Sequence, residues 1–187
     1  MCCAGDRARL NRFWDEMQDT PLFQEHEVKN RADYRDFAVP LSLHMDGTPV
    51  TGIGKPNSQS EDIYSWSSIT AIGSTIDILF FIFAIFTDLI AKSAVGNTMD
   101  VFWRRLIWSM WWLWLGVWPD EDDHGVKYTM DNNPSAFLKK LKPLAGGFFG
   151  VLWVNKCDLD FLPGNWDYLY VKADHIITIN QSLMNQQ

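Results

Sequence analysis

Cysteine is scarce in this chain, and none of the spacings that cysteine-based sites require is present. Only Cys2, Cys3 and Cys157 occur among the 187 residues, and they contain no CxxC pair. A disulfide framework or a zinc ribbon needs more cysteines at paired spacings. These counts argue against both classes and indicate a reducing, intracellular compartment.

The sequence also lacks a signal peptide and a long apolar run. Residues 1–7 contain no apolar stretch of the kind that a secretory signal requires. The apolar run between Asp77 and Asp88 would cover only about 15 Å as a helix, whereas the hydrocarbon core of a bilayer is roughly 30 Å thick. We therefore expect no secretory signal and no membrane-spanning helix.

Basic residues are too few for a strong nucleic-acid binder. The chain has 16 lysines and arginines against 23 acidic residues, which gives a net charge of −7. A surface of that sign repels phosphate backbones, so we expect weak DNA binding or none by this chain alone. A local patch of positive charge that could attract DNA is offered by a short helix expected at residues 135–142, which carries Lys139, Lys140 and Lys142.

The glycines near Lys55 do not form a phosphate-binding loop. A P-loop needs the pattern GxxxxGK[ST], and here Lys55 is followed by Pro56, with no glycine five residues before Gly54. The dinucleotide-binding pattern is absent too. We interpret these glycines as turn residues.

Three segments have the character of β-strands. Residues 40–46 alternate apolar and polar side chains, residues 62–69 alternate with aromatic and β-branched residues, and residues 148–155 are a short apolar run of β formers. Gly47 and Pro49 are expected to end the first strand, which leaves Asp46 at its carboxyl end. The first two strands form a plausible antiparallel pair.

Two helices are predicted between the second and third of these strands. Ser74 and Asp77 resemble a helix start before an apolar run, which predicts a helix over residues 76–94. Asn97 opens a second helix over residues 98–117, in which tryptophans are dense. These aromatic residues could stack bases or lie at a lipid interface, but core or subunit packing is the simpler interpretation. The fold class that follows is α/β, a small mixed sheet with packed helices.

The remaining segments divide the chain into three parts. Residues 1–38 form a polar lead-in expected to pack loosely, residues 39–163 form the core with a helical insertion at 97–147, and residues 164–187 form a divergent tail. Residues 120–125 match half of a calcium-binding loop, but Lys127 stands where that motif has an apolar residue. A solvated acidic loop is the better interpretation.

Asp46, Asp158 and Asp160 follow two apolar strands that are separated by helices. In a two-metal phosphoryl-transfer site, two ions about 3.5–4 Å apart are bridged by hard oxygen ligands, and carboxylates at adjacent strand ends can supply these ligands. The competing interpretation for Asp46 is that it caps a turn before Gly47. The residues alone leave both alternatives open.

Several longer patterns add a resemblance to a known group of proteins. They are Pro40-Leu41…His44-x-Asp46-Gly47-x-Pro49-Val50-x-Gly52-x-Gly54-Lys55, Asp62-x-x-Ser65-Trp66-Ser67-Ser68, Phe102-Trp103…Trp114-x-x-x-x-Trp118-Pro119-Asp120, and Pro143-Leu144-Ala145-Gly146-Gly147…Gly150-Val151-Leu152-Trp153…Asp158-Leu159-Asp160. These patterns resemble transposon-derived proteins of dinoflagellates and, more distantly, the CACTA and Plavaka groups of cut-and-paste transposases. The resemblance covers roughly residues 10–163.

The resemblance implies an RNase H-like catalytic core with an Asp-Asp-Asp/Glu site that binds Mg²⁺ or Mn²⁺. Asp46 would be the first catalytic acid and metal ligand, Asp158 the second, and Asp160 the alternative for the second. DNA would be the substrate of the parent family, cleaved and joined in the nucleus.

The sequence departs from that family in two places. Met45 stands where relatives usually have glycine, and the similarity fades after Leu162, where the third acid should follow. Asp167 and Asp174 lie in no convincing helix, so we expect an incomplete transposase domain that is inactive alone. The alternative is a structural or membrane-surface protein that uses its Trp-rich helices, which could also mediate homo-oligomers. One exposed patch formed by Phe81, Phe83, Trp111 and Trp114 would favour that alternative.

Overall fold

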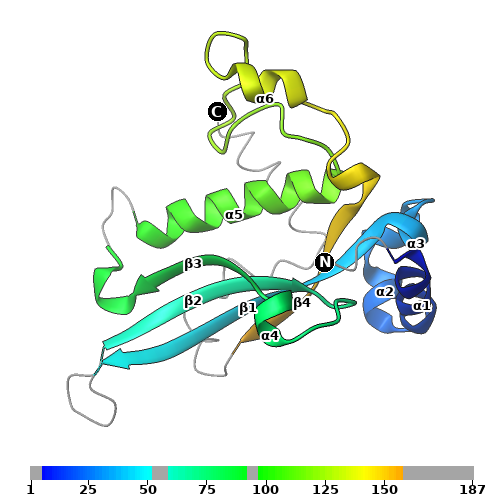
Figure 1. Cartoon of the computed structure of the whole chain (residues 1–187), viewed down its shortest axis with the longest axis horizontal. Coiled ribbons are helices and arrows are strands. Elements are labelled where there is room, and N and C mark those ends of the chain that lie inside the picture. Colours follow the sequence, from blue (N-terminus) through cyan, green and yellow to red (C-terminus); the bar gives the residue numbers. More distant parts are fainter. Residues whose placement is uncertain (1–5, 52–58, 92–96, 158–187) are drawn as a thin grey trace.

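A four-stranded mixed sheet organises the protein (Figure 1). The computed structural model describes residues 6–51, 59–91 and 97–157. The strand order is β3-β2-β1-β4; β1 to β3 are antiparallel neighbours, and β4 runs parallel to β1. The strands are β1 (Ala38–Thr51), β2 (Gln59–Ser68), β3 (Phe80–Phe86) and β4 (Phe149–Cys157).

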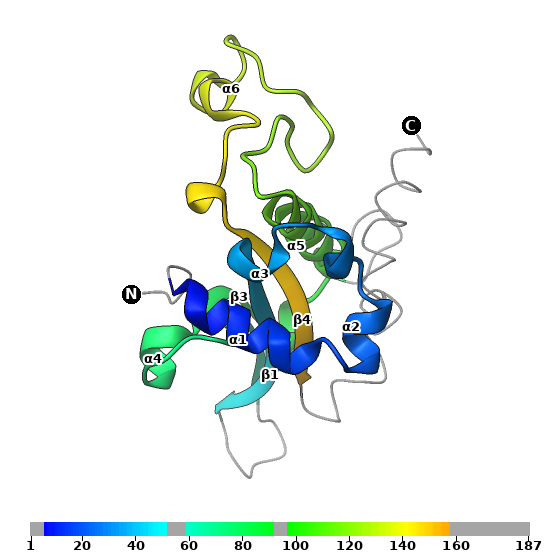
Figure 2. The ribbon, with the colours of Figure 1, turned by 90° about the vertical axis from the view of Figure 1, so that its right-hand side faces the viewer.

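Six α-helices accompany these strands in the described part of the chain. Three of them, α1 to α3, gather at the end of the sheet where β1 begins (Figure 1). The longest, α5, lies along one face of the sheet, and Figure 2 shows α1 and α5 on opposite sides of β4. Their bounds are α1 (Arg7–Met17), α2 (Pro21–Glu25), α3 (Tyr34–Phe37), α4 (Thr75–Ile78), α5 (Thr98–Leu115) and α6 (Pro134–Lys139).

The N-terminal helix α1 belongs to the core, so the expectation of a loosely packed lead-in is wrong. Leu10 and Trp14 are fully buried, and the Trp14 indole Nε1 donates a hydrogen bond to the Ala38 carbonyl at 3.0 Å. The Trp14 ring also contacts Trp153 of β4 edge to face, with centroids 5.2 Å apart. Few apolar residues lie in this segment, but they fall on one helix face, and that face is sufficient for close packing.

Strand β1 pairs with β2 as expected but is longer than its sequence suggests. It continues through Gly47 and Pro49 to Thr51, so Asp46 lies within the strand and opposite Ile63, not in a turn. The register shifts between Pro49 and Thr51, and a bulge is one of the places where a sheet accommodates proline. The interpretation of Asp46 as a turn cap is therefore excluded.

The helix predicted over residues 76–94 is wrong. The start signal is real, since Asp77 accepts hydrogen bonds from the Ser74 backbone and hydroxyl, but α4 lasts only four residues. The chain then forms β3, which pairs with β2. Phenylalanine and isoleucine favour strands, and a short run that is apolar throughout has no periodicity to separate helix from strand.

The second predicted helix is confirmed as α5. It ends at Gly116, which has the left-handed φ of 73° that a helix C-cap favours. Its inner face packs on Leu43, Met45 and Tyr64 of the sheet, and the residues that do so include Met99, Phe102, Trp103 and Leu106. Within the described residues, no helix is both long and apolar enough to cross a bilayer.

Residues 116–148, between α5 and β4, form a segment that we call the excursion. It carries α6 and stands clear of the sheet (Figures 1 and 2). A single bridge between Val117 and Pro143 closes its base. The short basic helix expected here is present as α6, and the strand expected at residues 148–155 is present as β4.

Candidate functional site

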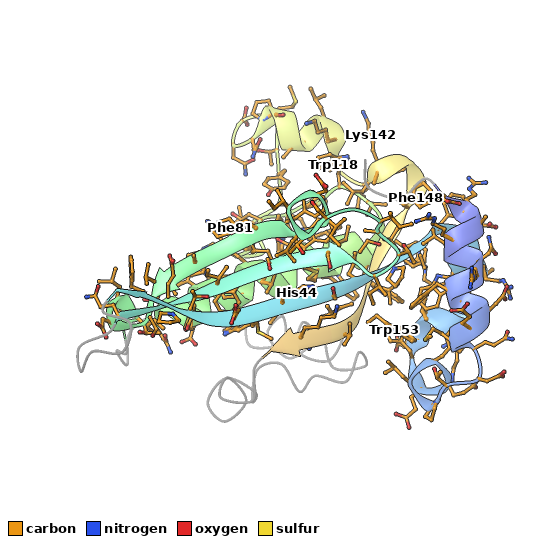
Figure 3. All side chains as sticks on the ribbon, turned by 60° about the horizontal axis from the view of Figure 1, so that its bottom comes forward. His44, Phe81, Trp118, Lys142, Phe148 and Trp153 are labelled. Atoms are coloured by element: carbon orange, nitrogen blue, oxygen red, sulfur yellow. The ribbon has the colours of Figure 1, made fainter. Side chains whose placement is uncertain are left out.

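A strip of polar side chains lies on the face of the sheet turned away from α5, where Figure 3 labels His44. Leu43 and Met45 pack under α5, so the alternation of β1 places Ser42, His44 and Asp46 on the other face. Ser42 Oγ lies 2.9 Å from His44 Nε2. Ser67 Oγ of β2 lies 2.8 Å from Ser42 Oγ and 3.1 Å from His44 Nε2. One imidazole nitrogen is thus held by two hydroxyl groups.

This environment favours the neutral form of His44. Burial lowers the pKa of His44, and the positive charge of Lys156 lowers it further. Lys156 is opposite His44 in the β1–β4 pairing and is exposed. The strip therefore carries a neutral imidazole beside a charged ammonium group.

Asp46 is the described member of the predicted acidic pair. It is exposed, two residues beyond His44 on the same strand. The parallel pairing of β1 with β4 brings Met45 opposite Cys157, and the residues that follow these two in the sequence are Asp46 and Asp158. Asp158 and Asp160 themselves lie outside the described residues.

The donor set fits a divalent cation only in part. A carboxylate such as that of Asp46 is the hard oxygen ligand that Mg²⁺ and Mn²⁺ prefer. In residues 6–51, 59–91 and 97–157, however, no group of three or more His, Cys, Asp or Glu side chains could hold a metal ion. Asp167 and Asp174, the weak candidates for a third acid, lie outside those ranges.

The acidic loop on the excursion uses its carboxylates for internal contacts. Lys127 Nζ donates to both carboxylate oxygens of Asp120 at 3.1 Å and lies 2.8 Å from Glu121 Oε2. Asp123 accepts a hydrogen bond from Arg105 Nε at 3.2 Å. These contacts favour the interpretation as a solvated, ion-paired loop over the calcium-binding one.

The contiguous exposed patch that would favour the membrane-surface alternative does not form. Phe81 is 69% exposed, but Phe83 stacks on Phe102 with ring centroids 4.9 Å apart. Trp114 contacts Phe149 edge to face inside the core. The aromatic residues that were to form one surface are thus divided between surface and interior.

Asp62 gives the structure a testable pH dependence. It is 9% exposed, and burial raises the pKa of its carboxyl group above the ordinary value. A carboxyl group that holds its proton more tightly when folded favours the native state at low pH. The stability that the protonated Asp62 carboxyl group contributes is lost as the pH rises through its folded-state pKa.

We therefore expect Asp62→Asn to melt at a higher temperature than wild type at pH 7.5. The advantage should shrink as the pH falls toward about 3, below the unfolded pKa of about 3.9, where the wild-type carboxyl group is largely protonated in both states. Thermal melts across this range test it, with exposed Asp131→Asn as the control. A difference in melting temperature between wild type and Asp62→Asn that is the same at every pH would contradict the raised pKa of Asp62.

Sequence reasoning identified Asp46 but missed the partners of His44. Ser67 and Lys156 come from β2 and β4, and nothing in their local sequence connects them with β1. Their signal is the strand register, which only the folded chain supplies.

Comparison of the chain with known proteins identified no relative. No family model matches the sequence, and no match is found among curated proteins or solved structures.

Proposed function

We propose that the chain is part of an RNase H-like, DDE-type transposase core, with Asp46 and Asp158 as its first two catalytic acids. The observation that carries the proposal is the parallel register of β1 and β4, which ends with Met45 opposite Cys157. The mixed sheet is also consistent with it, because β4 returns beside β1 after α5 and the excursion. DNA as the substrate and the nucleus as the location are parts of this proposal.

The register supports a shared cation site for a geometric reason. Neighbouring strands lie about 4.8 Å apart, and paired residues direct their side chains to the same face. If the pairing continues for one more residue, the Asp46 and Asp158 carboxylates both come within reach of one cation. Asp160 is the alternative second ligand, because a strand continued through it would direct residues 158 and 160 to the same face.

The residues around Asp46 suit a phosphate group near the cation. Bound Mg²⁺ would supply charge stabilisation at a phosphoryl oxygen. Lys156 places a positive charge on the same face, opposite His44 in register. The hydrogen bonds of Ser42 and Ser67 fix the His44 ring beside the site.

Strand cleavage is not expected from this chain alone. Two carboxylates bind one Mg²⁺ weakly and leave the second side of an in-line displacement poorly stabilised. The net charge of −7 also repels DNA over a Debye length of about 8 Å at physiological salt. We therefore expect cation binding without efficient nicking of supercoiled DNA. Robust nicking that Asp46→Ala abolishes would show that the site is complete.

Titration with Mn²⁺ tests the proposed ligands. The wild-type chain should bind one Mn²⁺ with a dissociation constant of about 1 mM, within the range of weakly charged sites. Asp46→Asn should weaken binding at least tenfold, because a carboxylate ligand is lost. Asp131→Asn removes the same charge on the excursion and should leave the affinity unchanged. Equal losses of Mn²⁺ affinity in the two variants would show that only the net charge of the chain matters. That result would overturn the assignment of Asp46 as a ligand.

A further inference from the structure

An open groove runs between strand β3 and helix α5 (Figure 1), whereas the polar strip lies on the face of the sheet turned away from α5. The volume of the groove is about 890 Å³, and sites that bind small molecules typically have volumes of about 300–1,000 Å³. Helix α5 lines it with residues from every turn between Thr98 and Leu113, and the sheet contributes Trp66 and residues 81–83. At 1.5 Å per residue, the part of α5 that lines the groove is about 22 Å long.

The walls of the groove are mostly apolar and partly open to water. Phe81 is 69% exposed and Val101 is 45% exposed, whereas Phe83 stacks on Phe102 with ring centroids 4.9 Å apart. The other apolar residues in the walls are Trp66, Ile82, Leu106, Met110 and Leu113. Because removing such side chains from water is favourable, the body of a ligand for this groove should be apolar.

Two of the four polar residues that line the groove have groups left for a ligand. Asn97 and Thr98 use their side-chain oxygens to accept hydrogen bonds from nearby backbone N–H groups. Arg105 and Ser109 lie one turn apart on the same side of α5. Arg105 donates through Nε to Asp123 Oδ2 at 3.2 Å. Within the described part of the chain, the two Nη groups of Arg105 and the Ser109 hydroxyl make no hydrogen bond.

We propose that this groove binds a fatty acid, with its carboxylate on Arg105 and Ser109 and its alkyl chain along the apolar walls. Among the residues that line the groove, Arg105 is the only charged one, so the site is complementary to an apolar molecule with a single negative group. A guanidinium group binds a carboxylate through two parallel N–H donors, and the Nη groups of Arg105 supply such donors. The Ser109 hydroxyl supplies a further donor beside them.

The position of Arg105 sets the length of the alkyl chain. It lies midway along the groove, eight residues from Asn97 and eight from Leu113, which is about 12 Å of helix in either direction. An extended carbon chain advances about 1.3 Å per bond, so either half of the groove accommodates about ten carbons. Decanoate is therefore the fatty acid that fits best. We expect a dissociation constant on the order of 10 μM, because one side of the chain stays in contact with water.

Calorimetric titration of the full chain with sodium decanoate tests the proposal. 1-Decanol has the same chain without the carboxylate and should bind about tenfold more weakly. Arg105→Gln should weaken decanoate binding about tenfold and leave decanol binding unchanged. The matched control is Arg12→Gln, which removes the same charge from a side chain on α1 that is 82% exposed, and it should bind decanoate like wild type.

Two further variants separate the ligand contact from a structural role of Arg105. Asp123→Asn removes the carboxylate that now holds Arg105, so this variant should bind decanoate at least as tightly as wild type. Val101→Trp fills the groove from an exposed position and should abolish binding, while circular dichroism shows that it is folded.

Four results would overturn the proposal. They are a wild type that does not bind decanoate at about 1 mM, binding that persists in Val101→Trp, decanol binding as tight as that of decanoate, and equal losses in Arg105→Gln and Arg12→Gln. If Asp123→Asn loses affinity as Arg105→Gln does, Arg105 acts by holding the acidic loop, and its assignment as the carboxylate ligand is wrong.

Discussion

Replacing Trp14 with alanine should lower the free energy of unfolding by about 3–5 kcal/mol, the usual cost of truncating a buried large aromatic residue. Trp14 is fully buried, and its ring contacts Trp153 and Tyr34 edge to face. The loss also removes the donor that satisfies the Ala38 carbonyl at the start of β1. An unsatisfied buried acceptor adds to the cost of the cavity.

Urea unfolding measures the size of this effect, and Trp118→Ala provides the matched control. Trp118 lies on the excursion and is 39% exposed, so its truncation should cost less than about 1 kcal/mol. Trp14→Phe should fall between the two, because it keeps part of the packing but loses the hydrogen bond. A Trp14→Ala variant as stable as Trp118→Ala would mean that α1 does not belong to the core.

The second large effect is expected at Gly150, where β4 passes under α5. A Cβ atom at this position would lie 2.6 Å from Leu113 Cγ and 2.8 Å from Leu41 Cδ1. Both leucines are packed in the core, so Gly150→Ala should cost about 1–3 kcal/mol through overpacking, and Gly150→Val more. The absence of a side chain at residue 150 is thus what allows α5 and β4 to approach closely.

Thermal unfolding of Gly150→Ala compared with Gly47→Ala tests this contact. Gly47 also lies in a strand, but a Cβ there would meet nothing closer than Asp62 Oδ1 at 3.7 Å, an ordinary contact. Adding Leu113→Ala to Gly150→Ala should recover part of the lost stability, because the clash and the cavity offset each other. If the two changes are simply additive, the proposed close approach is wrong.

The sequence allowed the sheet to be predicted better than the elements around it. Alternation on β1 and β2 identified the hairpin, because apolar and polar residues alternate along each strand. β3 lacked that signal, since both of its faces are apolar, and the Ser74–Asp77 start favoured a helix that ends after one turn. The position of β3 at an edge is set by tertiary pairing, which no local pattern records.

The first acid of the candidate site could be predicted from the sequence, but the residues around it could not. Asp46 followed from the β1 pattern, although the strand continues beyond it because the bulge near Pro49 accommodates the proline. The residues beside His44 on the same face, Ser67 and Lys156, belong to other strands. Their contacts with His44 depend on the register of three strands and could not be read from spacing along the chain.

The most direct test of the central claim is to locate bound Mn²⁺ by paramagnetic broadening of backbone amide signals. The claim is that β1 and β4 together form the cation site. Substoichiometric Mn²⁺ should selectively broaden the signals of residues 44–47 and 155–157, because broadening falls steeply with distance from the ion. It should leave residues 120–127 of the acidic loop unchanged, and Asp46→Asn should abolish the effect. Broadening centred on the acidic loop, or spread evenly over the acidic surface, would contradict the account.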